Sequence, residues 1–303
     1  MRKMKNLSKI YILTAAVLWG AIGLFVNSLS SLGFSQPQIV LLRSVFSVVT
    51  MIPVMLLSKK GAFRVKLKDI WCFIGTGTIS LLLFNICYFY SMQYNGSLAV
   101  AAILLYTAPA FVTVISAFLF KEKLTKNKLF SLLLMFSGCV FVSGVFSGGA
   151  AFSVKGILFG LGSGIGYAMY SIFGRYAINR GYKSETISFY TFVFCLAGAL
   201  FICDVKKTAV MICSSPRAIL LSAGIGFICC VLPYVFYTKG LETTENSTAS
   251  ILATAEPLVA SLIGIFVYKD SVTVYLIIGI ILMITGIITM NLKKRTENDK
   301  TGV

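Results

Sequence analysis

Two ionisable residues stand out in this sequence because each lies inside a long apolar run. Arg43 follows Leu41 and Leu42, and Glu256 lies between Ala255 and Pro257. A charge in apolar surroundings is costly unless it is paired or hydrated, so both residues are candidates for a functional site. In such a site, a buried carboxyl group can carry a proton or contact an ammonium group. Two alternatives remain open: the two residues form a buried ion pair that only holds the molecule together, or Arg43 extends toward the surface.

Other kinds of chemistry find little support in the sequence. The chain contains no His, which removes His metal ligands, His proton relays and Ser–His or Cys–His nucleophile pairs. The eight Cys form no CxxC pair and most lie in apolar runs, so we interpret them as packing residues. No Walker motif is present. We therefore predict no metal, no cofactor and no enzymatic activity.

Composition indicates a membrane protein. The chain has 303 residues, of which 57% are hydrophobic and 12% charged, and its mean hydropathy is +0.89. A soluble domain cannot cover so much apolar surface with polar residues. A bilayer removes that requirement, and a helix crosses its hydrocarbon core with about 20 apolar residues.

Ten apolar runs are long enough to cross a bilayer, and short polar loops separate them. Such long runs without alternation predict helices and exclude barrel strands, so we expect an all-α integral membrane protein. The expected spans are Ile10–Ser28, Gln38–Leu57, Ile70–Ser91, Leu98–Phe120, Leu129–Phe146, Gly156–Gly174, Thr186–Cys203, Ala218–Thr238, Ser247–Tyr268 and Val274–Leu292.

The basic residues are distributed unequally between the two sides of these spans. Of 27 Lys and Arg residues, 21 fall on the side that holds both termini, five on the other, and one, Arg43, inside a span. Cytoplasmic loops are enriched in Lys and Arg, so both termini are predicted to be cytoplasmic. The short polar tail, with Lys293, Lys294, Arg295 and Lys300, fits this side only if the number of spans is even. The net charge of +17 thus indicates membrane topology, and we expect no nucleic-acid partner.

The two halves of the chain repeat one another at an offset of 148 residues. Pro109 then aligns with Pro257, Gly138 with Gly286, and Lys121-Glu122 with Lys269-Asp270. The first unit is residues 1–147 and the second is residues 148–303, the second with a short cytoplasmic tail. Each unit holds five spans, and because five is odd the second unit is inserted upside down. Inverted repeats are typical of secondary transporters, whose substrate site lies near the midplane between the halves.

The residues that carry these features also resemble a known family. They are Leu18-Trp19-Gly20 in the first span, Arg43 in the second, Pro109 in the fourth, Lys121-Glu122 just after it, and Ala255-Glu256-Pro257 in the ninth. With ten spans in two halves, the chain resembles the EamA family of the drug/metabolite transporter superfamily. That family usually has Gly-Glu where this chain has Lys269-Asp270 after Tyr268. The substitution keeps an acidic residue but changes how far its carboxylate extends from the backbone. The resemblance implies transport of small metabolites, amino acids or drugs.

Several further residues are candidates for the central site. Six aromatic residues with polar tips lie within spans, and of these we expect Trp19, Tyr106 and Tyr170 to line a cavity; the others are Tyr88, Tyr167 and Tyr234. Asn85 is a further candidate, because an amide in a membrane span needs a partner. The small residues Ala249, Ala253, Ala260 and Gly264 flank Glu256 at helical spacing and point it into the bundle.

Two other patterns concern the helices themselves. Pro109 and Pro257 interrupt their spans at equivalent positions, so we expect each to act as a helix hinge or as a static kink. The glycine-rich stretch 160–166 lacks the GxGxxG spacing of a nucleotide-binding loop. Its glycines at a spacing of four, Gly160 with Gly164 and Gly162 with Gly166, indicate close packing between membrane helices.

These observations predict a secondary transporter of the plasma membrane that works by alternating access. One Arg and one Glu in the site suit an amino acid or a similar zwitterionic or neutral solute, with export as the expected direction. The expected partners are this small-molecule solute, the lipid bilayer and protons as the coupling ion, and the expected state is a monomer or homodimer. The alternatives are an intramembrane enzyme, for which no catalytic pair beyond Arg43 and Glu256 is visible, and a channel-like facilitator.

Overall fold

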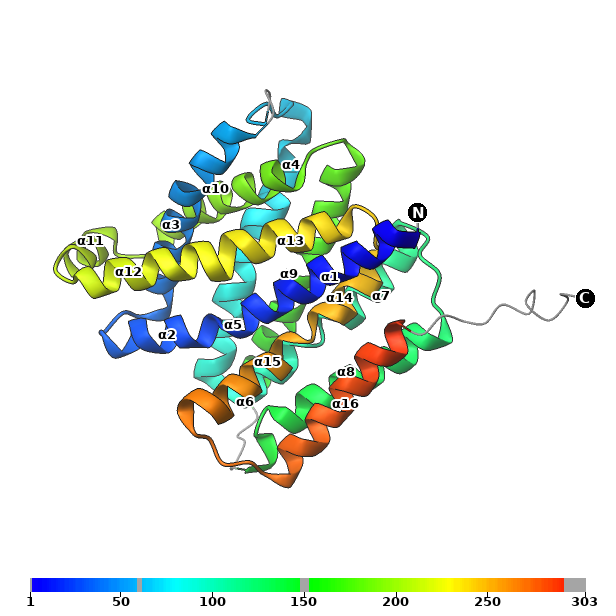
Figure 1. Cartoon of the computed structure of the whole chain (residues 1–303). Helices are drawn as coiled ribbons and strands as arrows, with labels where there is room; N and C mark the ends of the chain where they lie inside the picture. Colours follow the sequence, from blue (N-terminus) through cyan, green and yellow to red (C-terminus); the bar gives the residue numbers. More distant parts are fainter. Residues whose placement is uncertain (1, 59–61, 148–152, 292–303) are drawn as a thin grey trace, which may run out of the picture.

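The computed structural model describes residues 2–58, 62–147 and 153–291, and these segments contain helices and no strand (Figure 1). The expected all-α class is confirmed. Several basic residues of the charge count, namely Lys59, Lys60 and those of the C-terminal tail, lie outside the described residues, as does the boundary between the two repeats at residues 147 and 148.

The first half of the chain folds into helical passes, each made of one helix or of consecutive helices, and one of them contains a π-helical segment, η2. The elements are α1 (Arg2–Gly20), α2 (Ile22–Ser31), α3 (Gln36–Leu57), η1 (Leu67–Asp69), α4 (Ile70–Ile74), η2 (Gly75–Leu82), α5 (Leu83–Asn95), α6 (Leu98–Leu105), α7 (Ala108–Leu119), α8 (Lys126–Val142) and η3 (Val145–Ser147).

The second half repeats this order with its own π-helical segments, η4 and η5. It adds a short helix, α11, which the apolar runs did not predict because it is amphipathic and only nine residues long. The elements are α9 (Val154–Asn179), α10 (Ser184–Ile202), α11 (Val205–Cys213), α12 (Pro216–Gly224), η4 (Ile225–Val231), α13 (Leu232–Leu241), α14 (Asn246–Ala253), α15 (Glu256–Ile263), η5 (Gly264–Tyr268) and α16 (Val274–Asn291).

Nine helical segments within the described residues are long and apolar enough to cross a membrane, with lengths from 18 to 29 residues. The helix α8 has 17 residues and is not among them. The expectation of exactly ten spans is therefore not confirmed, although α8 lies where the fifth span is predicted. We call the side where α1 begins and α16 ends the N-terminal face, and the other side the opposite face.

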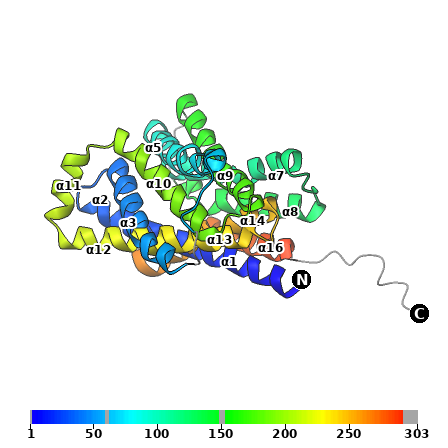
Figure 2. The same ribbon diagram turned by 90° about the horizontal axis from the view of Figure 1, so that it is seen from above.

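Helices of the first half pack on helices of the second half in symmetric pairs. The helix α1 packs on α13, and its equivalent α9 packs on α5; the pairs α3–α10, α7–α14 and α8–α16 each join equivalent helices. Equivalent helices run in opposite directions: Ser131 near the start of α8 bonds to the carbonyl of Gly286 near the end of α16, whereas Phe146, just after α8, stacks on Tyr275 at the start of α16. The two helices lie side by side at one edge of the bundle (Figures 1 and 2).

The helical segments Leu98–Leu119 and Asn246–Tyr268 are broken at equivalent places. The helix α6 ends at Leu105 and α7 begins at Ala108, while α14 ends at Ala253 and α15 begins at Glu256. Pro109 and Pro257 lie in the first turn of the second half-helix, where a missing N–H costs no intrahelical bond. The prolines thus start new half-helices and do not kink continuous ones.

Glycines in α9 allow the close packing that their spacing predicts. A β-carbon on Gly160 or Gly164 would meet Leu104 or Thr107 at the end of the α6 pass, and one on Gly162 or Gly166 would meet α5. The packing interpretation of this stretch is confirmed. The result is that α9 approaches both passes closely.

Candidate functional site

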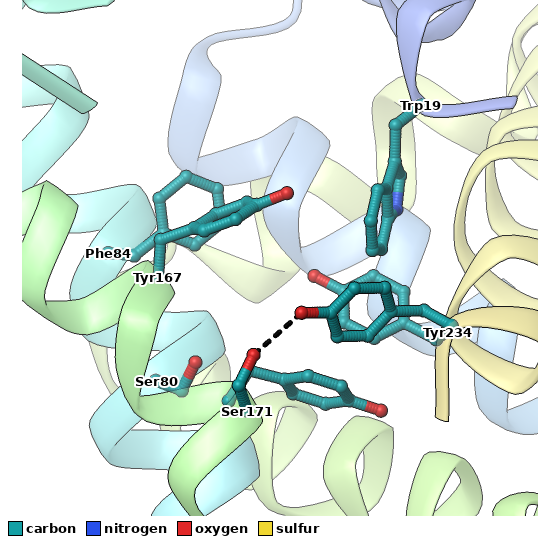
Figure 3. Close-up of a pocket in the computed structure, with 8 residues that line it drawn as sticks. Trp19, Ser80, Phe84, Tyr167, Ser171 and Tyr234 are labelled. Carbon is teal, nitrogen blue, oxygen red and sulfur yellow. Dashed lines mark hydrogen bonds between the residues drawn. The ribbon is translucent and has the colours of Figure 1, made fainter. Parts of the chain in front are cut away.

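A narrow pocket lies between helices of both halves, and its free volume of about 10 Å³ has room for roughly one water molecule (Figure 3). Aromatic rings form most of its wall, and a few hydroxyl groups supply the polar surface. Its lining residues are Trp19 from α1, Ser80 from η2 and Phe84 from α5, together with Tyr167, Tyr170 and Ser171 from α9 and Tyr234 and Tyr237 from α13. Walls that are mainly aromatic with a few fixed polar groups are typical of small-molecule sites.

Trp19 is the central ring of this wall. Its ring contacts those of Tyr234 and Tyr237 at centroid distances of 5.3 and 5.4 Å, and that of Tyr167 at 6.2 Å. Trp19 and Tyr167 enter the pocket from different sides (Figure 3). Edge-to-face contacts of this kind hold rings in defined orientations. Trp19 therefore lies in the predicted cavity.

Hydroxyl groups of the pocket are bonded in pairs between α9 and α13. The hydroxyls of Tyr170 and Thr238 lie 2.7 Å apart, and those of Ser171 and Tyr237 also lie 2.7 Å apart. Tyr170 is 5% exposed and its ring meets that of Tyr234 at 4.9 Å. Tyr170 thus lines the pocket, and its hydroxyl is already hydrogen-bonded within the protein.

Glu256 is the first residue of α15, at the break between the two half-helices. Its carboxylate accepts a long hydrogen bond of 3.5 Å from the hydroxyl of Tyr167, which lines the pocket. The hydroxyl of Tyr106, at the equivalent break after α6, also lies within hydrogen-bonding reach. The N-terminus of α15 adds a partial positive charge that favours the carboxylate. Glu256 and Tyr106 therefore lie together beside the aromatic pocket.

Arg43 lies apart from this carboxylate. It is 7% exposed in α3, and the ion pairs of the described residues do not include it. The positive charge of Arg43 interacts electrostatically with Tyr234 of the pocket wall and with the neighbouring Cys229 and Cys230. Among the described residues, the structure therefore shows no direct ion pair between Arg43 and Glu256.

Asn85 makes a local contact in the structure. Its amide donates a hydrogen bond of 2.5 Å to the carbonyl of Leu81, one turn earlier in the same pass. It lies one residue from Phe84 but is not among the lining residues.

The main residues that we did not choose from the sequence are Tyr167, Tyr234 and Tyr237. Their spacing along the sequence places them on shared helix faces, and this pattern could have identified them. Tyr167, Tyr170 and Ser171 share one face of α9, as Tyr234 and Tyr237 share one face of α13.

The two broken passes have matching contacts around their prolines. The hydroxyl of Thr113 donates to the carbonyl of Pro109 at 2.6 Å, and the hydroxyl of Ser261 donates to that of Pro257 at 2.7 Å. These residues are 148 apart in each case. The bonds stabilise the first turn of each second half-helix, so the bend occurs in the short segment before the proline.

Comparison with known proteins agrees with this geometry. A family model described as "EamA-like transporter family" matches the chain twice, over residues 6–144 and 154–292. The chain belongs to the EamA-like transporter family. The two matches cover nearly the whole sequence and correspond to the two halves described above. The EamA-like chain is therefore a multi-pass membrane protein of a transporter family, and the resemblance carried by its motifs is confirmed.

Relatives of this EamA-like chain carry transporter names. It is 23% identical over 296 residues to "Uncharacterized transporter YwfM" of Bacillus subtilis (strain 168), covering 96% of each chain. It is 25% identical over 277 residues to an "Uncharacterized transporter" of Archaeoglobus fulgidus, covering 91% of this chain and 93% of that one. A solved crystal structure superposes with a TM-score of 0.77 at 20% identity, covering 94% and 96% of the two chains. That likeness establishes the fold.

Proposed function

We propose that this EamA-like protein is a secondary transporter that moves an amino acid or a similar zwitterionic or neutral solute by alternating access. The observation that carries the proposal is the position of Glu256, which lies beside an aromatic pocket that both halves of the chain line. The solute would bind in that pocket, and the two halves would open it to one side of the membrane at a time. Export is the proposed direction.

The symmetry of the fold supports alternating access. Equivalent helices run in opposite directions, as expected for inverted repeats, and we propose that α8 is the fifth of ten spans because it lies along α16 from Ser131 to Phe146. The pocket lies where two helices of the second half, α9 and α13, meet the first half. The breaks before Pro109 and Pro257 then serve as the proposed hinges.

The charges near the pocket support the proposed class of solute. Glu256 offers a carboxylate to an ammonium group, while Arg43 offers a buried guanidinium to a carboxylate, and the rings of Trp19 and Tyr167 suit an apolar side chain. A polyanion would need more cations than this region supplies. We further propose that Glu256 exchanges protons during the cycle, which makes protons the coupling ion.

The proposed setting is the plasma membrane with both termini in the cytoplasm. The strong excess of Lys and Arg on the N-terminal face supports this orientation. The N-terminal face is then cytoplasmic, and α11 lies on the extracytoplasmic side.

Counterflow in proteoliposomes tests the proposal. Vesicles with purified protein are loaded with unlabelled amino acids in groups, and uptake of a labelled member of each group is followed with and without a pH step. We expect accumulation for at least one group, and we expect Glu256→Gln to reduce it by about tenfold or more, because a hydrogen bond to a charged group contributes about 1.5–3 kcal/mol. Tyr167→Phe should reduce it less.

The matched control is Glu185→Gln, which removes one negative charge from a partly exposed position at the start of α10. It should transport like the wild type. Counterflow that fails for every amino acid would refute the proposed solute, whereas downhill flux without counterflow would indicate a channel. A response to the pH step that Glu256→Gln retains would refute proton transfer by Glu256.

A further inference from the structure

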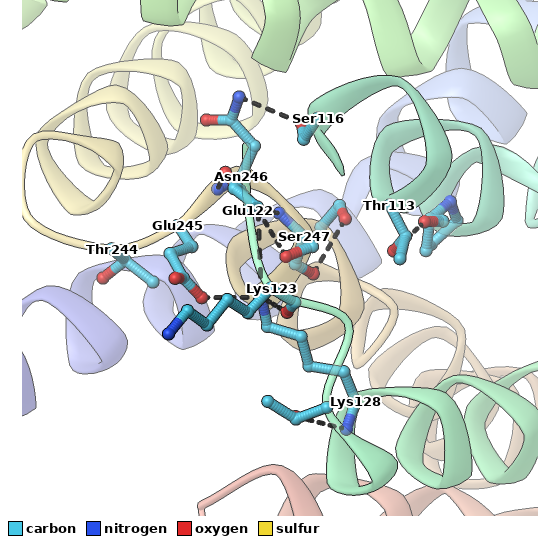
Figure 4. Close-up of polar contacts among 12 residues, drawn as sticks. Thr113, Ser116, Glu122, Lys123, Lys128, Thr244, Glu245, Asn246 and Ser247 are labelled. Atoms are coloured by element: carbon cyan, nitrogen blue, oxygen red, sulfur yellow. Dashed lines mark hydrogen bonds and ion pairs between the residues drawn. The ribbon is translucent and has the colours of Figure 1, made fainter. Parts of the chain in front are cut away.

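Glu122 reaches from the segment after α7 to the beginning of α14 (Figure 4). Its carboxylate accepts hydrogen bonds from the backbone N–H groups of Asn246 and Ser247, at 2.7 and 3.0 Å, and from the hydroxyl of Ser247 at 2.5 Å. Asn246 is the first residue of α14, so Glu122 binds the free N–H groups with which every helix begins. One half of the chain thus caps a broken pass of the other half.

A buried polar network surrounds this cap. Lys128 forms ion pairs with Glu245 at 2.6 Å and with Glu122 at 3.9 Å, and only 5% of its side chain is exposed. The side chain of Asn246 accepts a hydrogen bond from Arg175 at 2.9 Å and lies 3.2 Å from the hydroxyl of Ser116, to which its amide donates. These contacts join α7, α8, α9 and α14 at the N-terminal face. Together they join the two halves of the chain on that side.

Asp270 occupies the equivalent position on the opposite face. It lies 148 residues after Glu122, and the residues before the two acids, Lys121 and Lys269, both have left-handed backbones with φ of 55° and 61°. The backbone N–H of Glu122 donates to the carbonyl of Ser116 at 3.2 Å, and that of Asp270 to the carbonyl of Gly264 at 3.1 Å. The two turns therefore match in detail, although non-glycine residues rarely adopt this conformation.

The two acids differ in what their side chains contact. Asp270 is exposed, and the hydrogen bonds and ion pairs of the described residues include none from its side chain. The helix that it would cap by symmetry is α6, which begins at Leu98 and is capped by its own Ser97 through a long bond of 3.4 Å to Val100. Of the two acids, only Glu122 forms hydrogen bonds to the start of a helix. We call this contact between Glu122 and α14 the latch, and in the structure it is formed at the N-terminal face.

We propose that Glu122 is a gating residue: it holds the N-terminal face closed by capping α14, and Asp270 caps α6 in the same way when that face opens. The inference rests on the proposed alternating-access function. In each state one acid binds the start of one broken pass, and the other acid is released to solvent. The shorter side chain of Asp270 requires α6 to approach more closely, which lets the two states differ in stability.

Hydrogen–deuterium exchange of the full-length protein in lipid nanodiscs tests the latch without any substrate. Two regions are followed by mass spectrometry, residues 243–252 around the start of α14 and residues 95–104 around the start of α6. Glu122→Gln should raise amide exchange in 243–252 by about tenfold, since each tenfold corresponds to about 1.4 kcal/mol of lost protection. It should also lower exchange in 95–104, because the opposite face then closes.

Three variants make the result decisive. Glu122→Asp keeps the carboxylate and should show part of both changes, whereas Glu185→Gln removes a charge elsewhere and should show neither. Ser247→Ala removes one of the three hydrogen bonds and serves if Glu122→Gln does not fold; it should produce smaller changes of the same sign in both regions.

If exchange rises in residues 243–252 but stays unchanged in residues 95–104, Glu122 is only a local helix cap and the proposal is overturned. No change of exchange in either region would also overturn the proposal. Because no solute is needed, failure of the latch would leave the transport proposal untouched. Failure of counterflow alone would refute the solute and leave the latch standing.

Discussion

Gly20 allows α1 to approach α15 next to Glu256. A β-carbon at this position would lie 2.6 Å from Cβ of Val259 and 2.9 Å from the backbone oxygen of Glu256. Carbon atoms in ordinary contact are about 3.5–4.0 Å apart, so Gly20→Ala requires the two helices to separate by about 1 Å. Neither atom belongs to the free end of a flexible side chain, and the strain cannot be relieved by a change of rotamer alone.

We expect Gly20→Ala to destabilise the protein relative to a matched variant, Gly23→Ala. A β-carbon on Gly23 would meet nothing within 4 Å. Both glycines lie at helix ends next to the same break, and each substitution gains at most about 1 kcal/mol of helix propensity, so the difference between them reflects mainly the steric cost. Overpacking a close contact costs about 1–3 kcal/mol, which is the difference that we expect between the two variants.

Thermal unfolding in detergent micelles measures this difference. The midpoint of Gly20→Ala should fall several degrees below that of Gly23→Ala, and counterflow by Gly20→Ala should also fall because Trp19 and Glu256 move apart. Equal midpoints for the two variants would refute the claim that Gly20 sets the contact between α1 and α15. A lower midpoint with unchanged counterflow would separate helix packing from the geometry of the pocket.

Two further predictions concern the two faces of the molecule. Arg180 bonds to the buried carboxylate of Asp69 at 3.0 Å, so Arg180→Gln should lower the free energy of unfolding by about 1–3 kcal/mol; Arg180→Lys should lose less, and a wild-type thermal midpoint for Arg180→Gln would contradict this account. Cys213 is the exposed thiol among the eight, whereas Cys203 is partly exposed. A membrane-impermeant maleimide should therefore label intact cells at Cys213, Cys213→Ser should abolish the labelling, and a requirement for permeabilisation would show that the proposed orientation is reversed.

The helical passes were predictable because they depend on local composition. Apolar runs located the spans, and the offset of 148 residues located the breaks at Pro109 and Pro257 as equivalent points. The helix α11 escaped prediction because a short amphipathic helix has no long apolar run. The bounds of α8 were predicted too far along the chain, since the apolar run to Phe146 continues past Val142, where the helix itself ends.

The sequence by itself determined the class of the protein and its two related halves and marked Glu256 as a candidate site residue, since hydropathy, repetition and an isolated charge are properties of the chain. Only the tertiary structure decided that Tyr167 and Tyr106 face Glu256, that Arg43 does not pair with it, and that Glu122 caps α14 while Asp270 is free of such a contact. These contacts join residues from different helices. They depend on how each helix is rotated about its axis and on which neighbour it meets, and neither is encoded in the local pattern of residues.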